Sequence, residues 1–156
     1  MWKYIAAFLI SMVPLIELRA GVPFAVGMGM NQFVAIIVCA VGNMLPVPFI
    51  YFFARKFLLW GEHKKYIGGI CKFFLSKGEK AGQKLVAKTG RGGLFMALLL
   101  FVGIPLPGTG AWTGTLAASF LNMGFKSAVF SVMLGVLLAG IIMAVGSTAA
   151  FGFIGL

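Results

Sequence analysis

Two ionisable residues stand in an otherwise apolar stretch near the start of the chain. Glu17 and Arg19 follow an uncharged run from Tyr4 to Ile16. As a helix this run is about 20 Å long, which would carry both residues part-way across a bilayer. A carboxyl at that depth is costly when ionised and could exchange a proton, while a guanidinium can hold phosphate or carboxylate with two parallel hydrogen bonds. The alternative is a buried ion pair that only stabilises the packing.

A second group of candidate residues lies in the Pro- and Gly-rich run that starts at Pro105. Thr109 and Thr113 supply hydroxyls there, and the glycines permit close backbone approach. If Ala111 begins a helix, its free amides offer a positive end to an anionic group. Trp112 could stack on a substrate, although packing beside the glycines is the favoured interpretation. Asn43, in another apolar run, is more typical of a hydrogen bond between helices.

The remaining residues exclude most enzyme chemistry. The chain has no Asp, one His and three acidic residues. It therefore has too few of the residues needed for catalytic acid pairs, for carboxylate metal sites and for a Ser-His-Asp triad. Cys39 and Cys71 have no metal-ligand spacing. We therefore expect no enzymatic activity, no metal site and no cofactor.

Composition places these residues in a membrane. Of the 156 residues 61% are hydrophobic and only 10% are charged, which is too little polar surface to cover a soluble fold. The length allows one membrane domain of about four to six segments.

The net charge of +10 is concentrated in one part of the chain. Ten of the thirteen basic residues fall between positions 55 and 91. Basic segments stay on the cytoplasmic side of membrane proteins, so residues 55–93 should be cytoplasmic in a multi-pass protein of the inner (plasma) membrane. Apolar residues recur at helical spacing from Lys64 to Lys77, which predicts an amphipathic helix against the membrane lipids. No stacking-aromatic motif accompanies the lysines, so we expect no nucleic-acid partner.

The basic segment separates two apolar halves, residues 1–54 and 94–156. Each half contains one segment broken by proline and glycine, followed by one long segment. The long segment of the first half, 33–54, should be a transmembrane helix kinked near Pro46. We interpret the broken segments as re-entrant hairpins, because irregular backbone at membrane depth must be buried in protein or line a cavity. The alternative is four kinked full-length helices.

The two halves also align weakly with each other. A shift of 91 positions places Pro14 on Pro105, Ala20 on Ala111 and Asn31 on Asn122. Hairpins that enter and leave on one side would let each half cross the membrane once, so the halves would be inverted, as in inverted-repeat transporters. The predicted fold is therefore an all-α membrane protein, an inverted repeat of hairpin plus transmembrane helix.

Two runs carry a family resemblance. PLIELRAGVPFAVGMG (14–29) and IPLPGTGAWTGTLAA (104–118) resemble the signature regions of the small multidrug export protein family, a relative of the DedA/VTT superfamily. The resemblance covers nearly the whole chain. It implies two opposed re-entrant hairpins and a transporter, and in the wider superfamily proton-dependent transport or lipid flipping.

The resulting expectation is a proton-coupled transporter or exporter of small molecules, whose site lies where the two hairpin tips meet. The alternatives are a flippase or scramblase for anionic phospholipid or polyprenyl phosphate, and a membrane scaffold that transports nothing. Small residues four apart, such as Gly135 and Ala139, predict a helix contact face, and a homodimer surface is an alternative role for that face. The candidate residues for substrate and proton binding are Glu17, Arg19, Gly21, Pro23, Asn43, Pro105, Pro107, Gly108, Thr109, Gly110, Trp112 and Thr113.

Overall fold

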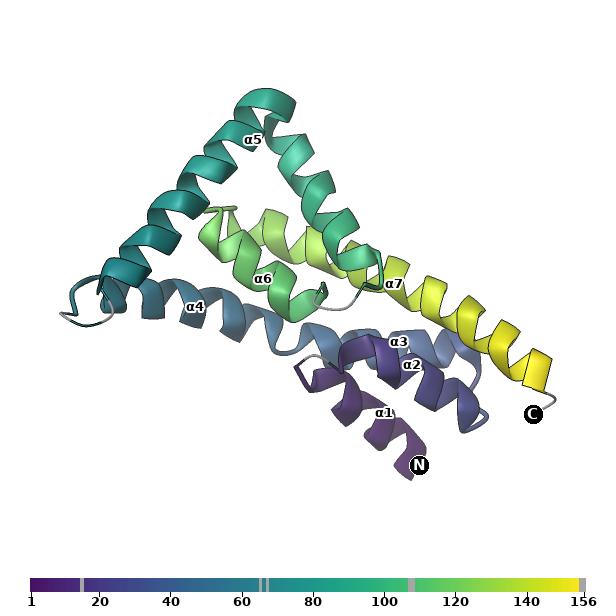
Figure 1. Ribbon diagram of the computed structural model, residues 1–156. Helices are drawn as coiled ribbons and strands as arrows, with labels where there is room; N and C mark the ends of the chain where they lie inside the picture. The colour runs from purple at the N-terminus through teal and green to yellow at the C-terminus, as the bar shows by residue number, and fades with distance from the viewer. Residues whose placement is uncertain (15, 65, 67, 107–108, 155–156) are drawn as a thin grey trace.

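Prolines, glycines and the charged positions divide the apolar sequence into helices. The structure is a computed structural model that describes residues 1–14, 16–64, 66, 68–106 and 109–154, and these residues include no strand. The helices are α1 (Trp2–Met12), α2 (Glu17–Gly27), α3 (Gln32–Met44), α4 (Val47–Glu62), α5 (Gly68–Gly103), α6 (Ala111–Phe120) and α7 (Phe125–Ile154) (Figure 1).

Two helical rods form the length of the molecule. The first is α3 followed by α4, interrupted at Leu45 and Pro46 because proline donates no backbone hydrogen bond. The kink expected near Pro46 is therefore confirmed, but the helix continues beyond residue 54 to Glu62. The second rod is the uninterrupted α7. The stretches Gln32–Glu62 and Phe125–Ala150 are long and apolar enough to cross a membrane.

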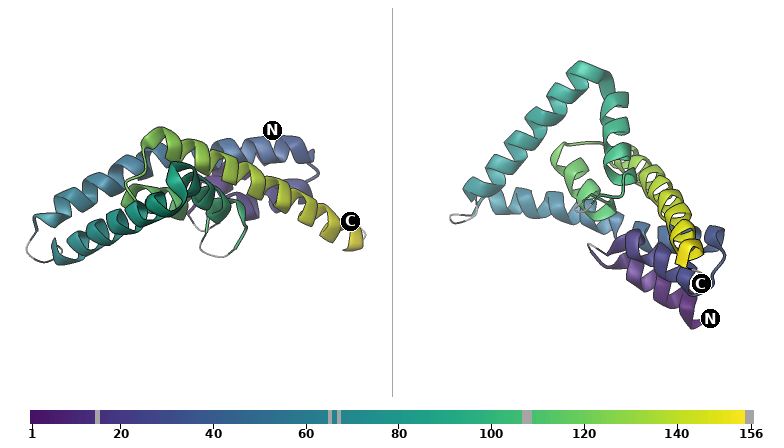
Figure 2. Two further views of the ribbon diagram at one scale, coloured as in Figure 1. Left: turned by 90° about the horizontal axis from the view of Figure 1, so that it is seen from above. Right: turned by 45° about the vertical axis from the view of Figure 1, so that its right-hand side comes forward.

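The two rods run antiparallel. The Tyr51 hydroxyl of α4 donates to the carbonyl of Met123, just before α7 begins. Near the other end of α7, the Gln32 side chain donates to the Thr148 hydroxyl. Figures 1 and 2 show both chain ends on the same side of the molecule, away from the connection between α4 and α5.

The first hairpin consists of α1 and α2. Each helix has 11 residues, about 16 Å, and the chain reverses between them. Gly21 of α2 lies so close to α1 that a Cβ there would collide with the Ser11 hydroxyl. The two arms therefore pack against each other as short, closely approaching helices.

The second hairpin consists of the last part of α5, from Gly90, and α6. Gly90 has φ 71° and ψ 179°, a conformation that is essentially limited to glycine, and α5 changes direction there. Figure 1 shows α5 leaving the end of α4 and then turning back, so that α4 and the two parts of α5 outline a triangle around α6. The helix expected from Lys64 begins at Gly68, and its lysines at 72, 80, 84 and 88 are exposed.

The two hairpins contact the rods in the same way. The first arm of each packs on the rod of its own half, α1 on α3 and α5 on α7. The second arm of each also contacts the rod of the other half, α2 on α7 and α6 on α4. The halves are thus joined through their second arms as well as through direct contact between the rods α3 and α7.

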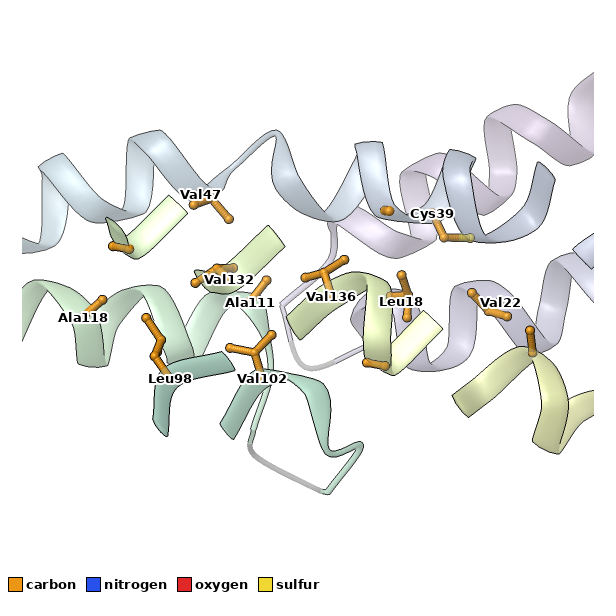
Figure 3. Close-up of a cluster of buried hydrophobic side chains, with 14 of the residues drawn as sticks. Leu18, Val22, Cys39, Val47, Leu98, Val102, Ala111, Ala118, Val132 and Val136 are labelled. Atoms are coloured by element: carbon orange, nitrogen blue, oxygen red, sulfur yellow. The ribbon is translucent and has the colours of Figure 1, made fainter. Parts of the chain in front are cut away.

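Small residues make this packing possible. Gly135 of α7 approaches Val102 and the Leu99 carbonyl of α5, while Gly140 approaches Ile36 of α3. The small-residue face of α7 is therefore a helix contact face inside the chain. Where the arms and α7 meet, buried apolar side chains form one core (Figure 3): Leu18, Leu98, Val102, Ala111, Val132 and Val136.

Many large apolar side chains are exposed on the outer surface. Phe33, Phe49 and Phe53 are 76%, 72% and 71% exposed, and large aliphatic side chains are exposed on every rod. Contiguous apolar surface of this extent marks contact with a membrane or another protein. Together with the two long apolar rods, it indicates a membrane protein.

Candidate functional site

Glu17 joins the two hairpins. It is the first residue of α2, it is only 5% exposed, and its backbone has the positive φ of 49° that non-glycine residues adopt rarely. Its carboxylate accepts hydrogen bonds from the backbone N–H groups of Ala111 at 3.2 Å and Trp112 at 3.1 Å. These amides open α6, so a side chain of the first hairpin caps the N-terminus of the second hairpin's returning helix.

Gly110 leaves the space that this cap needs. A Cβ at Gly110 would overlap the Glu17 carboxylate. Only glycine therefore lets the carboxylate reach the end of α6. As expected, α6 begins at Ala111 and its first amides bind an anionic group. That group is the Glu17 carboxylate of the protein itself.

Arg19 makes the complementary contact. Its guanidinium donates to the backbone carbonyls of Leu106 and Thr109, and to the Thr109 hydroxyl. The Thr109 hydroxyl in turn lies 2.9 Å from the carbonyls of Ile104 and Leu106. These carbonyls follow the C-terminus of α5, where a positive charge is favoured by the helix dipole.

We call this contact the tip junction: Glu17 and Arg19 on the first hairpin, and Leu106 and Thr109 to Trp112 on the second. Within the described residues, the two charged side chains bind backbone groups across the junction rather than each other. A hydrogen bond to a charged group contributes about 1.5–3 kcal/mol, and losing one partner leaves the other buried and unsatisfied. The tip junction therefore depends on both residues.

A small cavity lies behind the junction. Glu17, Arg19 and Asn43 line it together with apolar side chains that include Val102 and Val136. It has room for about one water molecule. Asn43 is 2% exposed, and its Oδ1 atom is buried without a hydrogen-bond partner among the residues described. In this conformation the cavity is too small for an organic substrate.

The other candidate residues occupy three kinds of position. Gly21 and Pro23 lie within α2, behind the junction, where Gly21 serves the contact with α1. Thr113 lies next to the tip junction, and its hydroxyl donates to the Gly110 carbonyl at 3.5 Å. Pro105 precedes Leu106 in the connecting loop. Pro107 and Gly108 lie outside the described residues.

Sequence reasoning missed the backbone acceptors and the wall of the cavity. The carbonyl of Leu106 binds Arg19, but no side-chain pattern identifies a carbonyl as a partner. Val102, Val136 and Ala139 line the cavity from α5 and α7. They are apolar residues among many in their helices, and only the fold brings them to this place.

Fold and site together define an all-helical membrane protein whose two helical hairpins meet at a charged junction. The family model described as "Putative small multi-drug export protein" matches residues 17–142, and the chain belongs to this family. The matched range begins at Glu17 and contains the whole tip junction. No curated protein and no solved structure matches the chain.

Proposed function

We propose that this chain is a proton-coupled membrane transporter of small molecules, in which Glu17 is the proton-carrying residue. The observation that carries the proposal is the pair of hydrogen bonds that the backbone amides of Ala111 and Trp112 donate to the Glu17 carboxylate. They make the contact between the hairpins depend on the charge of one carboxyl. The family description, small multi-drug export, supports small organic molecules as substrates.

Protonation weakens the tip junction. The ionised carboxylate binds the α6 amides through charge-assisted hydrogen bonds and interacts favourably with the positive end of the helix. A protonated carboxyl loses the charge and gains an O–H donor. Asn43 lines the same cavity, and its unpartnered Oδ1 is a suitable acceptor for that donor. Proton uptake thus favours a state in which Glu17 turns from α6 toward Asn43.

The closed cavity supports a gating role for this step. With room for about one water molecule, the cavity admits no substrate until the hairpin tips separate. Release of α6 by Glu17 removes one of the two sets of contacts between the tips, and full separation also requires the Arg19 contacts to break. Proton binding and opening are then linked.

In the bilayer, we propose that the two rods cross and the hairpins re-enter. Each arm of the first hairpin is about 16 Å long, half of a hydrocarbon core of about 30 Å, so its tip would lie near the midplane. This is the inverted layout implied by the DedA/VTT resemblance. The basic part of α5 would lie on the cytoplasmic face of the plasma membrane.

The deciding experiment uses purified protein in liposomes. A fluorescent organic cation and a labelled anionic phospholipid are compared, each with and without a proton gradient. We expect the gradient to drive the organic cation and to leave the lipid where it is. Lipid movement without cation movement would instead indicate a flippase, in which the Arg19 guanidinium leaves its carbonyl partners to hold phosphate. No movement of either would favour a scaffold.

A further inference from the structure

A large apolar pocket, open at the molecular surface, lies between α4, the start of α5 and α6. Its volume is about 460 Å³, within the range of about 300–1,000 Å³ that is usual for ligand pockets. Aromatic rings from two helices line it: Phe53 and Phe57 of α4, and Trp112 and Phe120 of α6. We call it the aromatic pocket. It is separate from the small cavity behind the tip junction.

Two features of the lining restrict the occupant. The rings of Phe53 and Phe57 are stacked, with centroids 6.2 Å apart and an angle of 19° between planes. Parallel rings on one wall favour a flat aromatic molecule, and their faces attract a delocalised positive charge. Among the described residues that line the pocket there is no charged side chain, so a compact ion would gain no compensation from them.

The Trp112 indole adds a polar requirement. Its Nε1 atom is buried and has no hydrogen-bond acceptor among the residues described. An unpaired buried N–H is unfavourable, and an occupant that carries an acceptor would satisfy it once the indole turns toward the pocket. A lipid acyl chain could fill the space but would leave this donor unpaired.

We propose that the aromatic pocket binds flat aromatic molecules that are neutral or carry a delocalised positive charge and that offer a hydrogen-bond acceptor to Trp112. The backbone N–H of Trp112 donates to Glu17 at 3.1 Å, so one residue belongs to both the pocket and the tip junction. Movement of α6 away from Glu17 also moves the indole. This coupling rests on the proposed function, whereas binding in the pocket does not.

Binding is measured first, without any gradient. A protein carrying Trp2→Phe and Trp60→Phe keeps Trp112 as its single tryptophan and is placed in bilayer nanodiscs of phosphatidylethanolamine and phosphatidylglycerol. Berberine, a flat delocalised cation with ether oxygens, should quench Trp112 fluorescence to saturation. Brominated phospholipid tests the other occupant. If brominated phospholipid quenches Trp112 fluorescence and added berberine does not reduce this quenching, an acyl chain occupies the pocket and the proposal is overturned.

Substitutions then locate the binding, followed by the fluorescence of berberine itself. Ala54→Leu narrows the pocket and should abolish saturable binding, whereas Ala149→Leu, on an exposed part of α7, should not. Trp112→Phe keeps a ring but removes the donor, so berberine should bind about tenfold more weakly. Binding of N-methylacridinium, a flat cation without an acceptor, should not change. Equal binding by Ala54→Leu and Ala149→Leu would refute the assignment.

Transport separates the two proposals. If berberine binds as expected but no gradient drives its movement in liposomes, the pocket stands and the proposed function is wrong. If a gradient drives organic cations while Ala54→Leu binds and transports normally, transport stands and the pocket is not its substrate site.

Discussion

At the scale of single residues, each charge of the tip junction lies at the helix end that favours its sign: the negative charge at a helix N-terminus and the positive charge near a helix C-terminus. Glu17 lies at the N-terminus of α6 and Arg19 among the carbonyls that follow α5. Opposite charges only two positions apart thus bind the two arms of the second hairpin at its tip, near the C-terminal end of α5 and at the N-terminal end of α6. A pair that bound only each other would stabilise the first hairpin alone. Both side chains therefore contribute to the contact between the two hairpin tips.

The first prediction concerns the charge of Glu17. Glu17→Gln keeps the size of the side chain and one acceptor for the α6 amides, but it can neither ionise nor bind a proton. We expect a folded, inserted protein whose transport no longer responds to a proton gradient, measured in liposomes with an imposed gradient. Glu62→Gln, which neutralises an acid at the end of α4 outside the junction, is the control and should behave like the unchanged protein. A full gradient response in Glu17→Gln would end the proton-carrier assignment.

The second prediction concerns the shape of the cation at position 19. The Arg19 guanidinium reaches three acceptors on Leu106 and Thr109, whereas a lysine ammonium presents a point charge that cannot copy this fork. Arg19→Lys should lower the free energy of unfolding in detergent by about 1–3 kcal/mol. Thr109→Val removes only the hydroxyl partner and should cost less. Unchanged stability in Arg19→Lys would show that the charge alone matters and that the carbonyl contacts contribute little.

The chemical types at the junction were predictable from the sequence, but their partners were not. An acid and an arginine in an apolar run, and a helix start at Ala111, can be identified from residue types alone. That the acid caps this helix depends on the distance between two hairpins 94 positions apart. The distance between the two hairpins is determined by how the rods pack. Many apolar residues can make similar packing contacts, so the sequence predicts this packing only weakly.

At the scale of elements, one local motif is shared by the two halves. The second arms α2 and α6 end in the same motif: Met30 N–H donates to the Ala25 carbonyl, and Met123 N–H to the Ala118 carbonyl. A residue with positive φ, Gly29 or Asn122, precedes each methionine. From 25 to 118 and from 30 to 123 the spacing is 93 positions, not the 91 used in the alignment. Glycine and asparagine fill the same conformational role at Gly29 and Asn122, and the flanking pairs Ala25/Ala118 and Met30/Met123 are identical at this spacing. The alignment at 91 positions therefore compared residues that do not occupy equivalent places at these helix ends.

The third prediction tests the close approach at Gly110. In Gly110→Ala the new methyl group occupies the space of the Glu17 carboxylate, so the cap on α6 must shift or break. We expect a loss of about 1–3 kcal/mol in the free energy of unfolding and a loss of gradient response like that of Glu17→Gln. Gly146→Ala is the matched control, because a Cβ there meets nothing within 4 Å. If both alanine variants are equally stable and active, the carboxylate does not need this space.

The fourth prediction tests the bend in α5. Gly90→Ala places a side chain in a conformation that is essentially open to glycine alone, and should cost about 1–3 kcal/mol of unfolding free energy, measured by thermal unfolding in detergent. Gly92→Ala, two positions later in the helical part with open space around it, should be neutral or stabilising by up to about 1 kcal/mol. Equal effects at both positions would mean that α5 is continuous through Gly90.

At the scale of the whole molecule, the rods assign both ends of the chain to one side. Lys3 donates to the Met28 carbonyl at 3.4 Å, so the N-terminus lies beside the turn that precedes Gln32. Gln32 in turn contacts Thr148, near the end of α7. From Gln32 to Tyr51 the rod rises about 28 Å, nearly the thickness of a hydrocarbon core. Tyr51 contacts Met123, so Lys126 belongs to the opposite end from Lys3.

The fifth prediction is the membrane topology that follows from this arrangement. With re-entrant hairpins, each half crosses once, so the termini lie outside while the basic part of α5 and the start of α7 lie inside. With four kinked full-length helices, the basic part is still inside, but Lys3 is cytoplasmic and Lys126 is external. The positive-inside rule barely separates the two, because each topology exports one lysine outside the basic segment. The contact between Lys3 and Met28 favours the hairpin topology in this prediction, since a full-length first helix would put these two residues on opposite sides of the membrane.

Single cysteines measure this directly. In a background of Cys39→Ala and Cys71→Ala, the variants Lys3→Cys, Ser76→Cys and Lys126→Cys are each labelled in intact cells with a membrane-impermeant thiol reagent. We expect labelling at position 3 and protection at 76 and 126, with all three labelled after the cells are opened as the control for reactivity. Ser76 is exposed on the basic part of α5 and reports the cytoplasmic side in both topologies. Labelling at 126 with protection at 3 would overturn the hairpins. A junction of two tips at mid-depth would then be impossible, because a full-length first helix cannot return Glu17 to the end of α6 while keeping Lys3 beside Met28.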